Sequence, residues 1–193
     1  MVANRGYESL DAKSRLRLIE AAAELLSIEG HPSFTARRVA DRAELKPQLV
    51  HYYFRSMEDL VVAVFHRTTA EYFQRHDEAL SSVRPIHALW QLNRNLPVAR
   101  LMTEFIALEK RYPKLREVMR QAGCNFRALQ TEAIEQRMRD RDLAPGTPGP
   151  EALAMLLSAV ARNYVIEDGV GMHLGHAEIE AFVLDIIDRI EPG

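Results

Sequence analysis

Apolar residues recur every three or four positions along most of this 193-residue chain, which is the spacing expected of helices that bury one face. Prolines, glycines and short polar runs separate these stretches. Residues 1–10 lack an apolar period and are predicted to form a flexible N-terminus. The sequence therefore predicts an all-α fold. The expected helices cover residues 11–29, 56–78, 85–95, 97–111, 114–141, 151–168 and 176–190, with two shorter ones inside 35–54.

Residues 35–54, TARRVADRAELKPQLVHYYF, have the pattern of two short helices joined by a tight turn. Thr35 is suited to cap the first helix, because its hydroxyl can accept a hydrogen bond from an unpaired backbone N–H of the first turn. Pro47 fits the first position of the second helix, where a missing N–H costs nothing. Val50 and Phe54 lie four residues apart and give this second helix its buried side.

The other side chains of the second helix point away from that buried side, and most of them are polar. A glutamine on such a face can form paired hydrogen bonds with adenine, while lysine and tyrosine can reach phosphates or base edges. The face therefore suits insertion into the major groove of DNA. The alternative is a solvated helical hairpin with ordinary surface residues. The outward-facing residues are Lys46, Gln48, Leu49, His51, Tyr52 and Tyr53.

A longer ordered pattern surrounds this stretch and is carried by two runs, LRLIEAAAELLSIEG and FTARRVADRAELKPQLVHYYFRSMEDL. Its positions include Arg15, Ala21, Ala22, Gly30, Thr35, Val39, Ala40, Ala43, Tyr53, Phe54, Ser56, Glu58 and Leu60. Residues 15–62 thereby resemble the DNA-binding domain of the TetR family of transcriptional repressors. The resemblance implies an N-terminal three-helix helix-turn-helix domain, here residues 11–60, followed by a larger helical ligand-binding and dimerisation domain, here residues 61–193.

The sequence departs from the family pattern at four positions. Glu44 stands in the turn where the family usually has glycine, and a non-glycine residue in a left-handed turn costs on the order of 1–2 kcal/mol. Lys46, His51 and Met57 replace the usual serine-like cap, tyrosine and lysine. Pattern and resemblance together assign DNA contacts to Arg15, Thr35, Arg37, Lys46, Pro47, Gln48, His51, Tyr52, Tyr53 and Arg55.

The charge of the chain limits how such a surface could bind DNA. The formal net charge is −2, and residues 1–60 hold nine basic and nine acidic residues. Residues 35–55, however, hold five basic and two acidic residues, a local charge of +3. We therefore expect modest non-specific affinity for DNA, with the choice of operator depending also on shape and base contacts.

The fourth helix and the last two helices have separate predicted roles. Ser56 and Asp59 form a capping box that opens helix 56–78, and the resemblance makes this helix the mechanical lever. Helices 151–168 and 176–190 carry more apolar surface than a small chain can cover, so a two-fold contact forming a four-helix bundle is expected. The resemblance implies the same homodimer; a buried monomeric core is the alternative. The predicted interface residues are Leu153, Leu157, Ile179, Phe182, Val183, Ile186, Ile187 and Ile190.

Methionine and aromatic residues at helical spacing on several C-terminal helices indicate a cavity between these helices and the fourth helix. Such residues also serve in a plain core, but the resemblance, to a family that binds small lipophilic effectors, favours a pocket. Arg94 could add polar recognition. The predicted effector-binding residues are Trp90, Met102, Phe105, Met119, Phe126, Met155, Asn163 and Tyr164.

Other classes of function find little support in the sequence. The alternative is a helical enzyme or carrier acting on a hydrophobic small molecule without DNA binding, but no G-x-S-x-G, phosphate loop or H-E-x-x-H occurs. His173 and His176, with Glu167 and Asp168, match no known metal cage, so neither a metal nor a cofactor is predicted. The single Cys124 fits a reducing cytoplasm, and no apolar run approaches the ~20 residues of a membrane span.

The expected function is therefore that of a cytoplasmic, homodimeric transcriptional regulator, a repressor by the resemblance. It would bind a near-palindromic double-stranded DNA operator and leave it when a small lipophilic effector binds. No catalytic residues and no membrane association are predicted.

Overall fold

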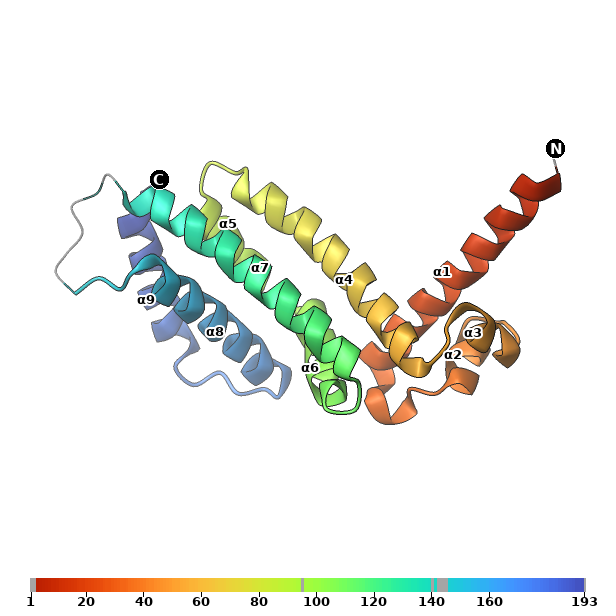
Figure 1. The fold of residues 1–193 in the computed structure, drawn as a ribbon. Coiled ribbons are helices and arrows are strands. Elements are labelled where there is room, and N and C mark those ends of the chain that lie inside the picture. Colours follow the sequence, from red (N-terminus) through yellow and green to blue (C-terminus); the bar gives the residue numbers. More distant parts are fainter. Residues whose placement is uncertain (1–2, 95, 140, 142–145, 193) are drawn as a thin grey trace. The chain divides into compact units, whose positions relative to one another are not determined.

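The computed structural model describes residues 3–94, 96–139, 141 and 146–192, and every regular element among them is helical (Figure 1). The predicted all-α fold is thus confirmed. The elements are α1 (Ala3–Glu29), the short 3-10 helix η1 (His31–Ser33), α2 (Ala36–Arg42), α3 (Pro47–Tyr53), α4 (Met57–Leu80), α5 (Pro85–Asn93), α6 (Leu96–Glu109), α7 (Pro113–Met138), α8 (Pro150–Gly169) and α9 (His176–Ile190).

The first helix begins earlier than the apolar pattern indicates. A flexible segment over residues 1–10 is expected from the sequence, whereas α1 already starts at Ala3. Residues 1 and 2 lie outside the described residues. Once a helix is nucleated, each further residue adds a backbone hydrogen bond whether or not it has an apolar face to bury. Apolar periodicity therefore locates the packed part of α1 and not its start.

The chain forms two compact units that interleave along the sequence, whereas the predicted domains are continuous segments. The N-terminal unit contains the residues up to Ala70 together with Arg100–Met119; the C-terminal unit contains Glu71–Ala99 and the residues from Arg120 onward. The division falls within α4, within α6 and within α7, so each of these three helices contributes residues to both units.

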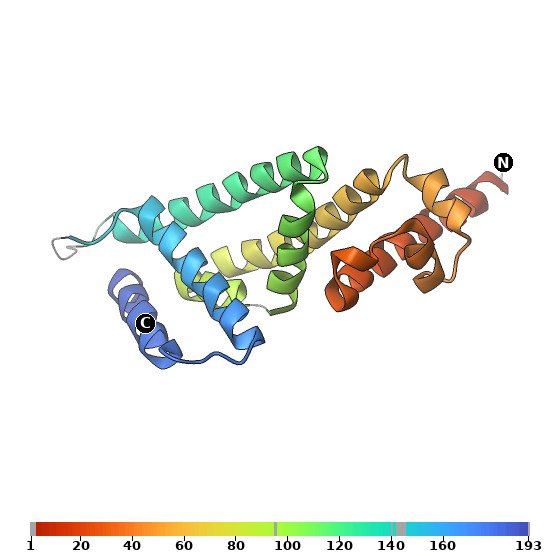
Figure 2. The same cartoon turned by 90° about the horizontal axis from the view of Figure 1, so that it is seen from below.

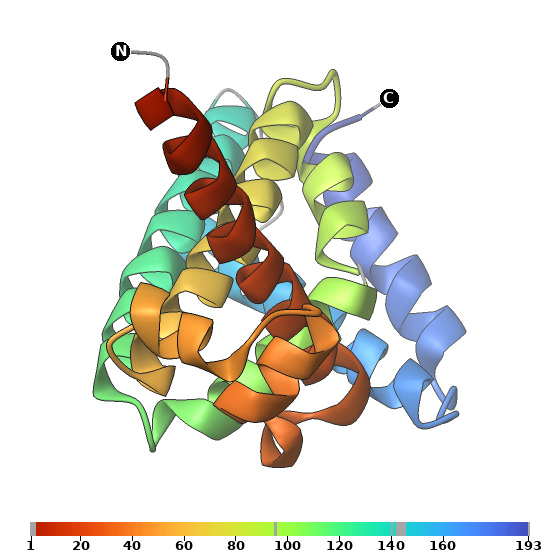
Figure 3. The same cartoon turned by 90° about the vertical axis from the view of Figure 1, so that its right-hand side faces the viewer.

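In the N-terminal unit, α2 packs on α1 and α3 packs on α2 (Figure 3). The first half of α4 and part of α6 complete the core, where the rings of Phe65 and Phe105 meet edge to face at 5.2 Å. Burial of these side chains, at about 1.5–3 kcal/mol each, is the main stabilising contribution. The core residues from the first four α-helices include Leu18, Ala22, Leu25, Leu26, Val39, Ala40, Val50, Leu60, Val61, Val64 and Phe65.

The end of α1 is fixed by a glycine and by a carboxylate from α6. Gly30 has a φ of 77°, a conformation that side chains rarely adopt, and its N–H donates to the Leu26 carbonyl at 3.1 Å. The Glu104 carboxylate then accepts the His31 backbone N–H at 2.7 Å and lies 2.9 Å from His31 Nδ1. These contacts set the direction in which the chain enters α2.

The C-terminal unit is built around α5, α8 and α9, with the later part of α7 packed against them. Figure 2 shows α8 and α9 side by side, and their inward faces share one apolar core with Trp90 of α5. The core residues are Ile86, Trp90, Ile134, Leu153, Ala154, Leu157, Ala161, Val183, Ile187 and Ile190.

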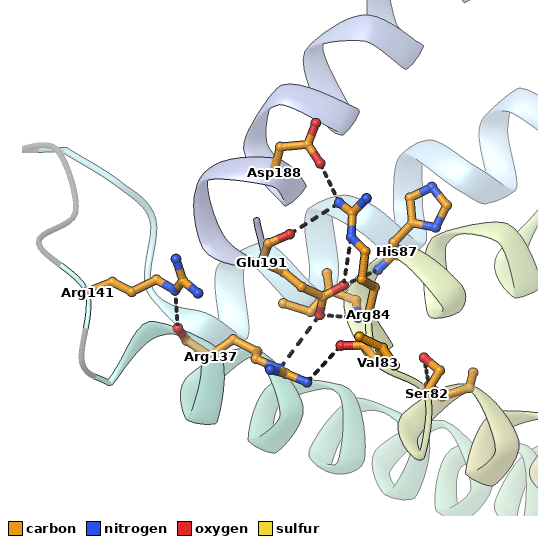
Figure 4. A network of polar contacts seen from close by, with 10 residues as sticks. Ser82, Val83, Arg84, His87, Arg137, Arg141, Asp188 and Glu191 are labelled. Carbon is orange, nitrogen blue, oxygen red and sulfur yellow. Dashed lines mark hydrogen bonds and ion pairs between the residues drawn. The ribbon is translucent and has the colours of Figure 1, made fainter. Parts of the chain in front are cut away.

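Glu191, just beyond α9, caps the N-terminus of α5 from 105 residues away (Figure 4). Its carboxylate is only 2% exposed and accepts the backbone N–H of Ile86 at 2.9 Å and of His87 at 3.2 Å. Arg84 and Arg137 lie within 4 Å of the same carboxylate. The first N–H groups of a helix have no partner inside it and favour negative charge. Glu191 therefore ties the end of α9 to the start of α5.

Candidate nucleic-acid interface

The helices α2 and α3 begin as their sequences predict. The Thr35 hydroxyl accepts the Arg38 backbone N–H at 3.4 Å, and Thr35 itself has extended backbone angles, as an N-cap requires. Pro47 occupies the first turn of α3. Both predictions are confirmed. Lys46 is the N-cap of α3, and its side chain makes no capping hydrogen bond. Its ammonium group is therefore not used to cap the helix.

The turn between the two helices keeps a left-handed residue although the glycine is missing. Glu44 has a φ of 54°, and the Leu45 N–H donates to the Ala40 carbonyl at 2.9 Å in the pattern of a Schellman motif. Arg17 of α1 offsets part of the strain, because its Nη2 donates to the Ala43 carbonyl at 2.6 Å and lies 3.4 Å from Glu44 Oε2. Sequence periodicity gives no signal for this contact.

The outer face of α3 is open to solvent in this chain. Tyr52 is 71% exposed, while Val50 and Phe54 on the opposite side are 1% and 3% exposed. The helix is thus amphipathic, with a polar surface that no described residue covers. The exposed residues of this surface, which we call the α3 face, are Lys46, Pro47, Gln48, His51 and Tyr52.

Two predicted DNA-contacting residues make contacts with neighbouring helices. The Tyr53 hydroxyl donates to Asp11 of α1 at 2.7 Å, and this hydrogen bond is the main reason that the pKa of Tyr53 is raised. The Arg15 guanidinium lies 5.2 Å from the centre of the Phe54 ring, so Arg15 is held at the end of α3 by a cation–π contact. Both residues therefore help to hold α3 against α1.

The basic residues near α2 divide into two groups. Arg38 and Arg42 both pair with Glu29 at the end of α1, so much of their charge is neutralised. Arg37 is 86% exposed and its nearest acidic atom, on Asp41, is 3.9 Å away. Arg55 is exposed just after α3. The positive charge left for a partner thus comes from Arg37, Lys46 and Arg55 rather than from all five basic residues of the segment.

The start of α4 is fixed by the predicted capping box. The Ser56 hydroxyl oxygen accepts the Asp59 backbone N–H at 3.1 Å, and the hydroxyl donates to the Asp59 carboxylate at 3.0 Å. Lys114 Nζ lies 2.7 Å from Asp59 and is the main reason that the Asp59 pKa is lowered. The Lys114 backbone N–H donates to Glu58 at 2.8 Å, so Glu58 caps the start of α7 and Lys114 joins the first turns of the two helices.

The eight predicted effector-binding residues are divided between the two units. Met102, Phe105 and Met119 belong to the N-terminal unit, and Phe105 is fully buried against Phe65. The other five are Trp90, Phe126, Met155, Asn163 and Tyr164 in the C-terminal unit.

Within the C-terminal unit these five residues also separate. Met155 is 63% exposed, and Asn163 is exposed with its amide donating to Glu167 at 2.8 Å, so neither lines an enclosed space within this chain. Tyr164 contacts both the Arg94 guanidinium, 4.2 Å from its ring centre, and the His176 ring, at 4.0 Å. Arg94 in turn pairs with Glu180 of α9.

The enclosed space beside Trp90 is small. A cavity of about 10 Å³ lies between α5, α7 and α8, enough for about one water molecule. Of the predicted effector-binding residues only Trp90 lines it. The lining residues are Ile86, Leu89, Trp90, Asn93, Gln130, Ile134, Ala154 and Leu157.

The predicted dimer interface mixes core residues with surface residues, and the core residues cannot contact a second copy. Five of them are buried inside the single chain, because α8 and α9 turn those positions toward α5 and each other; they present no surface to a second copy. These are Leu153, Leu157, Val183, Ile187 and Ile190. Ile179 and Ile186 are partly exposed, and Phe182 is 54% exposed. Sequence reasoning did not assign Leu156 and Ile166, which are also exposed on α8, to the interface.

His173, just before α9, and His176, the first residue of α9, pair with different carboxylates. His176 Nε2 lies 2.9 Å from Glu167, and His173 Nδ1 lies 3.4 Å from Asp168. The His176 contact is the main cause of the lowered pKa of Glu167.

Among the described residues, no helix combines the length and the apolar character needed to cross a bilayer.

Comparison with known proteins finds a family match for one segment of the N-terminal unit. The family model described as bacterial regulatory proteins, tetR family, matches residues 18–64. An uncharacterised HTH-type transcriptional regulator in the dhlA 5' region of Xanthobacter autotrophicus is 38% identical over 72 residues. That match covers 37% of this chain and 34% of the relative, so the chain matches about a third of that protein's length.

Solved structures share the fold over nearly the whole chain. A TetR-family transcriptional regulator, described as putative, from Rhodococcus sp. superposes with a TM-score of 0.75 at 15% identity, covering 93% of this chain and 99% of that one. GusR of Salmonella enterica has a TM-score of 0.71 at 16% identity, covering 94% and 96%. At these identities the likeness concerns the fold.

Proposed function

Because the chain belongs to the TetR family of transcriptional regulators, we propose that it is a cytoplasmic repressor that binds a near-palindromic DNA operator as a homodimer. A small effector bound in the C-terminal unit releases it. The alternative of a helical enzyme or carrier without DNA binding has no specific observation in its favour.

The observation that carries the proposal is the α3 face. The seven-residue helix α3 exposes a glutamine, a histidine and a tyrosine on one face, and these side chains contribute little to the stability of the fold. On the opposite face the buried Val50 and Phe54 pack against the rest of the unit and fix the position of the helix. Such a rigid, exposed polar helix fits the major groove, where Gln48 can pair with an adenine edge. Arg37, Lys46 and Arg55 supply phosphate contacts around it.

Dimerisation supplies the second α3 face that a near-palindromic operator requires. Two copies related by a two-fold axis would reach major grooves about 34–36 Å apart, or a multiple of that distance. The exposed apolar side chains of α8 and α9 are the proposed contact between copies. They are Met155, Leu156, Ile166 and Phe182.

Release by an effector requires a physical connection between the two units, and α4 provides one. Met57 follows α3 closely in the chain, and the last part of the same helix, from Glu71, belongs to the C-terminal unit. An effector that binds the DNA-competent and DNA-incompetent states unequally, by about 1–3 kcal/mol, would shift the population between them.

Fluorescence anisotropy with labelled duplexes tests the proposal. A duplex selected from a random pool by the protein should bind far more tightly than a scrambled duplex of the same length. Affinity for both should fall steeply as salt rises from about 50 to about 200 mM, because bound counterions are released. Equal affinity for the two duplexes would remove the sequence-specific function, and no binding to either would remove DNA binding altogether.

Two substitutions on this surface should have different consequences. Gln48→Ala should reduce the difference in binding free energy between the selected and scrambled duplexes by about 1–3 kcal/mol, because it removes a base contact. Arg37→Ala should weaken both duplexes alike and lower the salt dependence by about one counterion. Anisotropy titrations of both variants on both duplexes measure these effects. A uniform loss in both variants would contradict the assigned roles.

A further inference from the structure

His76, near the end of α4, is an unusual core residue. Its side chain is 0% exposed, and neither ring nitrogen has a hydrogen-bond partner among the described residues. Buried polar groups in folded proteins nearly always have partners, so one without any calls for an explanation. A core position with no polar role would be better filled by leucine, which carries no such penalty.

One of the rings beside His76 belongs to a stacked pair. Phe73 of α4 and Phe126 of α7 lie face to face, with ring centres 3.8 Å apart and planes inclined by 16°. The Phe126 ring centre is 5.4 Å from that of His76. Both phenylalanines are partly exposed, whereas His76 is not. A buried, unpartnered histidine thus lies next to one ring of a partly exposed stacked pair.

Further polar groups lie nearby on the same unit. Tyr72, whose ring is 4.9 Å from Phe126, donates its hydroxyl to Asn93 of α5. Trp90, one turn before Asn93, has a buried Nε1 without a partner among the described residues. The cavity that Asn93 and Trp90 line is only about 10 Å³. A ligand larger than water would therefore have to displace side chains. Phe126, partly exposed and 5.4 Å from His76, and its stacking partner Phe73 are the rings that we expect to move.

We propose that His76 is the polar anchor of the effector site, that its ligand is a small neutral aromatic compound bearing a hydroxyl group, and that the Phe73–Phe126 pair parts to admit the ring. This inference deepens the proposed function, on which the regulatory meaning of the site rests.

The chemistry of the surroundings selects this ligand class. A flat ring can replace one phenylalanine of the pair and keep the stacking contact. A hydroxyl can donate to one imidazole nitrogen or accept from the other, as neutral histidine offers one of each. Burial lowers the pKa of His76, so the imidazole is neutral near pH 7. A carboxylate would lose its hydration there and meet the negative charge of Asp77, which is costly.

Phenol and toluene form a matched pair of probes, since they differ in a hydroxyl and a methyl group of similar size. Trp90 is the only tryptophan in the sequence, so its fluorescence reports on this unit directly, and calorimetry gives an independent value. Phenol should bind saturably with a half-saturation below about 1 mM, and toluene and benzoate should each bind at least about tenfold more weakly.

Substitutions at His76 separate an anchor from plain packing. His76→Leu should abolish the preference for phenol over toluene, whereas His76→Gln, which keeps a donor and an acceptor, should retain part of it. His66→Leu, at an exposed histidine of the same helix, should leave phenol binding unchanged. Thermal unfolding of each variant establishes that it is folded, and His76→Leu should melt no lower than the unsubstituted protein.

Phenol binding that survives His76→Leu unchanged, or the absence of saturable phenol binding, overturns the proposed site. The selected duplex separates this failure from failure of the proposed function: a chain that binds the duplex but not phenol remains a regulator. Saturable phenol binding that leaves duplex affinity unchanged supports the site and overturns its role as the effector switch.

Discussion

Replacing Glu191 with alanine is expected to lower the free energy of unfolding by about 3–4 kcal/mol, a large share of the roughly 5–15 kcal/mol typical of a domain. The buried carboxylate accepts two backbone N–H groups at the start of α5, and hydrogen bonds to a charged group contribute about 1.5–3 kcal/mol each. Arg84 and Arg137 are 32% and 38% exposed, so their attraction to Glu191 is weakened by water and adds little.

Denaturant unfolding followed by circular dichroism measures this loss. The stability of Glu191→Gln should fall between those of the unsubstituted protein and Glu191→Ala. An amide can accept one of the two backbone N–H groups, but it turns its own NH2 group toward the other. Asp188→Asn is the matched control: Asp188 pairs with the same Arg84 but is 61% exposed, so its loss should cost no more than about 1 kcal/mol. Equal effects of Asp188→Asn and Glu191→Ala would mean that the cap contributes nothing beyond a surface ion pair.

The parts of the fold that follow from local chemistry could be predicted from the sequence. Thr35 caps α2 and Pro47 opens α3 because both act within one helical turn, and Ser56 with Asp59 does the same for α4. The exposed α3 face follows from the spacing of Val50 and Phe54. Each of these signals lies within a few residues of the feature that it predicts.

Contacts between distant segments could not be predicted in this way. Glu191 caps a helix that begins about a hundred residues earlier, and Arg17 completes the end of α2 from α1. Nothing in the spacing of either residue indicates its partner. The missing partners of His76 are equally invisible in the sequence, because a histidine within an apolar pattern reads the same whether or not it is hydrogen-bonded.

The apolar stripe of α9 shows the same limit. Ile187 and Phe182 belong to one periodic pattern, yet Ile187 is 0% exposed and Phe182 is 54% exposed. Periodicity shows that a helix has an apolar face, but not which neighbour covers each part of it. The stripe is wide enough to serve the core of the C-terminal unit with one edge, and we propose that a second copy uses the other.

Phe182→Asp is therefore expected to give monomers whose affinity for the selected duplex is lower by about 100-fold or more. Linking two binding modules raises affinity by about 10²–10⁴ without new contacts, and a monomer loses that gain while each α3 face stays intact. A charged residue at a half-exposed position should leave the fold of one chain in place, which a buried substitution such as Ile187→Asp would not.

Analytical ultracentrifugation gives the oligomeric state, and anisotropy on full and half operators gives the affinity. The variant should bind the full and half operators about equally. Leu174→Asp, in the loop before α9 at 96% exposure, is the control for adding a charge to an exposed apolar position, and it should remain dimeric. If the Phe182→Asp protein is dimeric and has normal operator affinity, the contact between copies does not lie at this edge of α9. If it is monomeric and still binds the full operator tightly, dimerisation is not needed for DNA recognition.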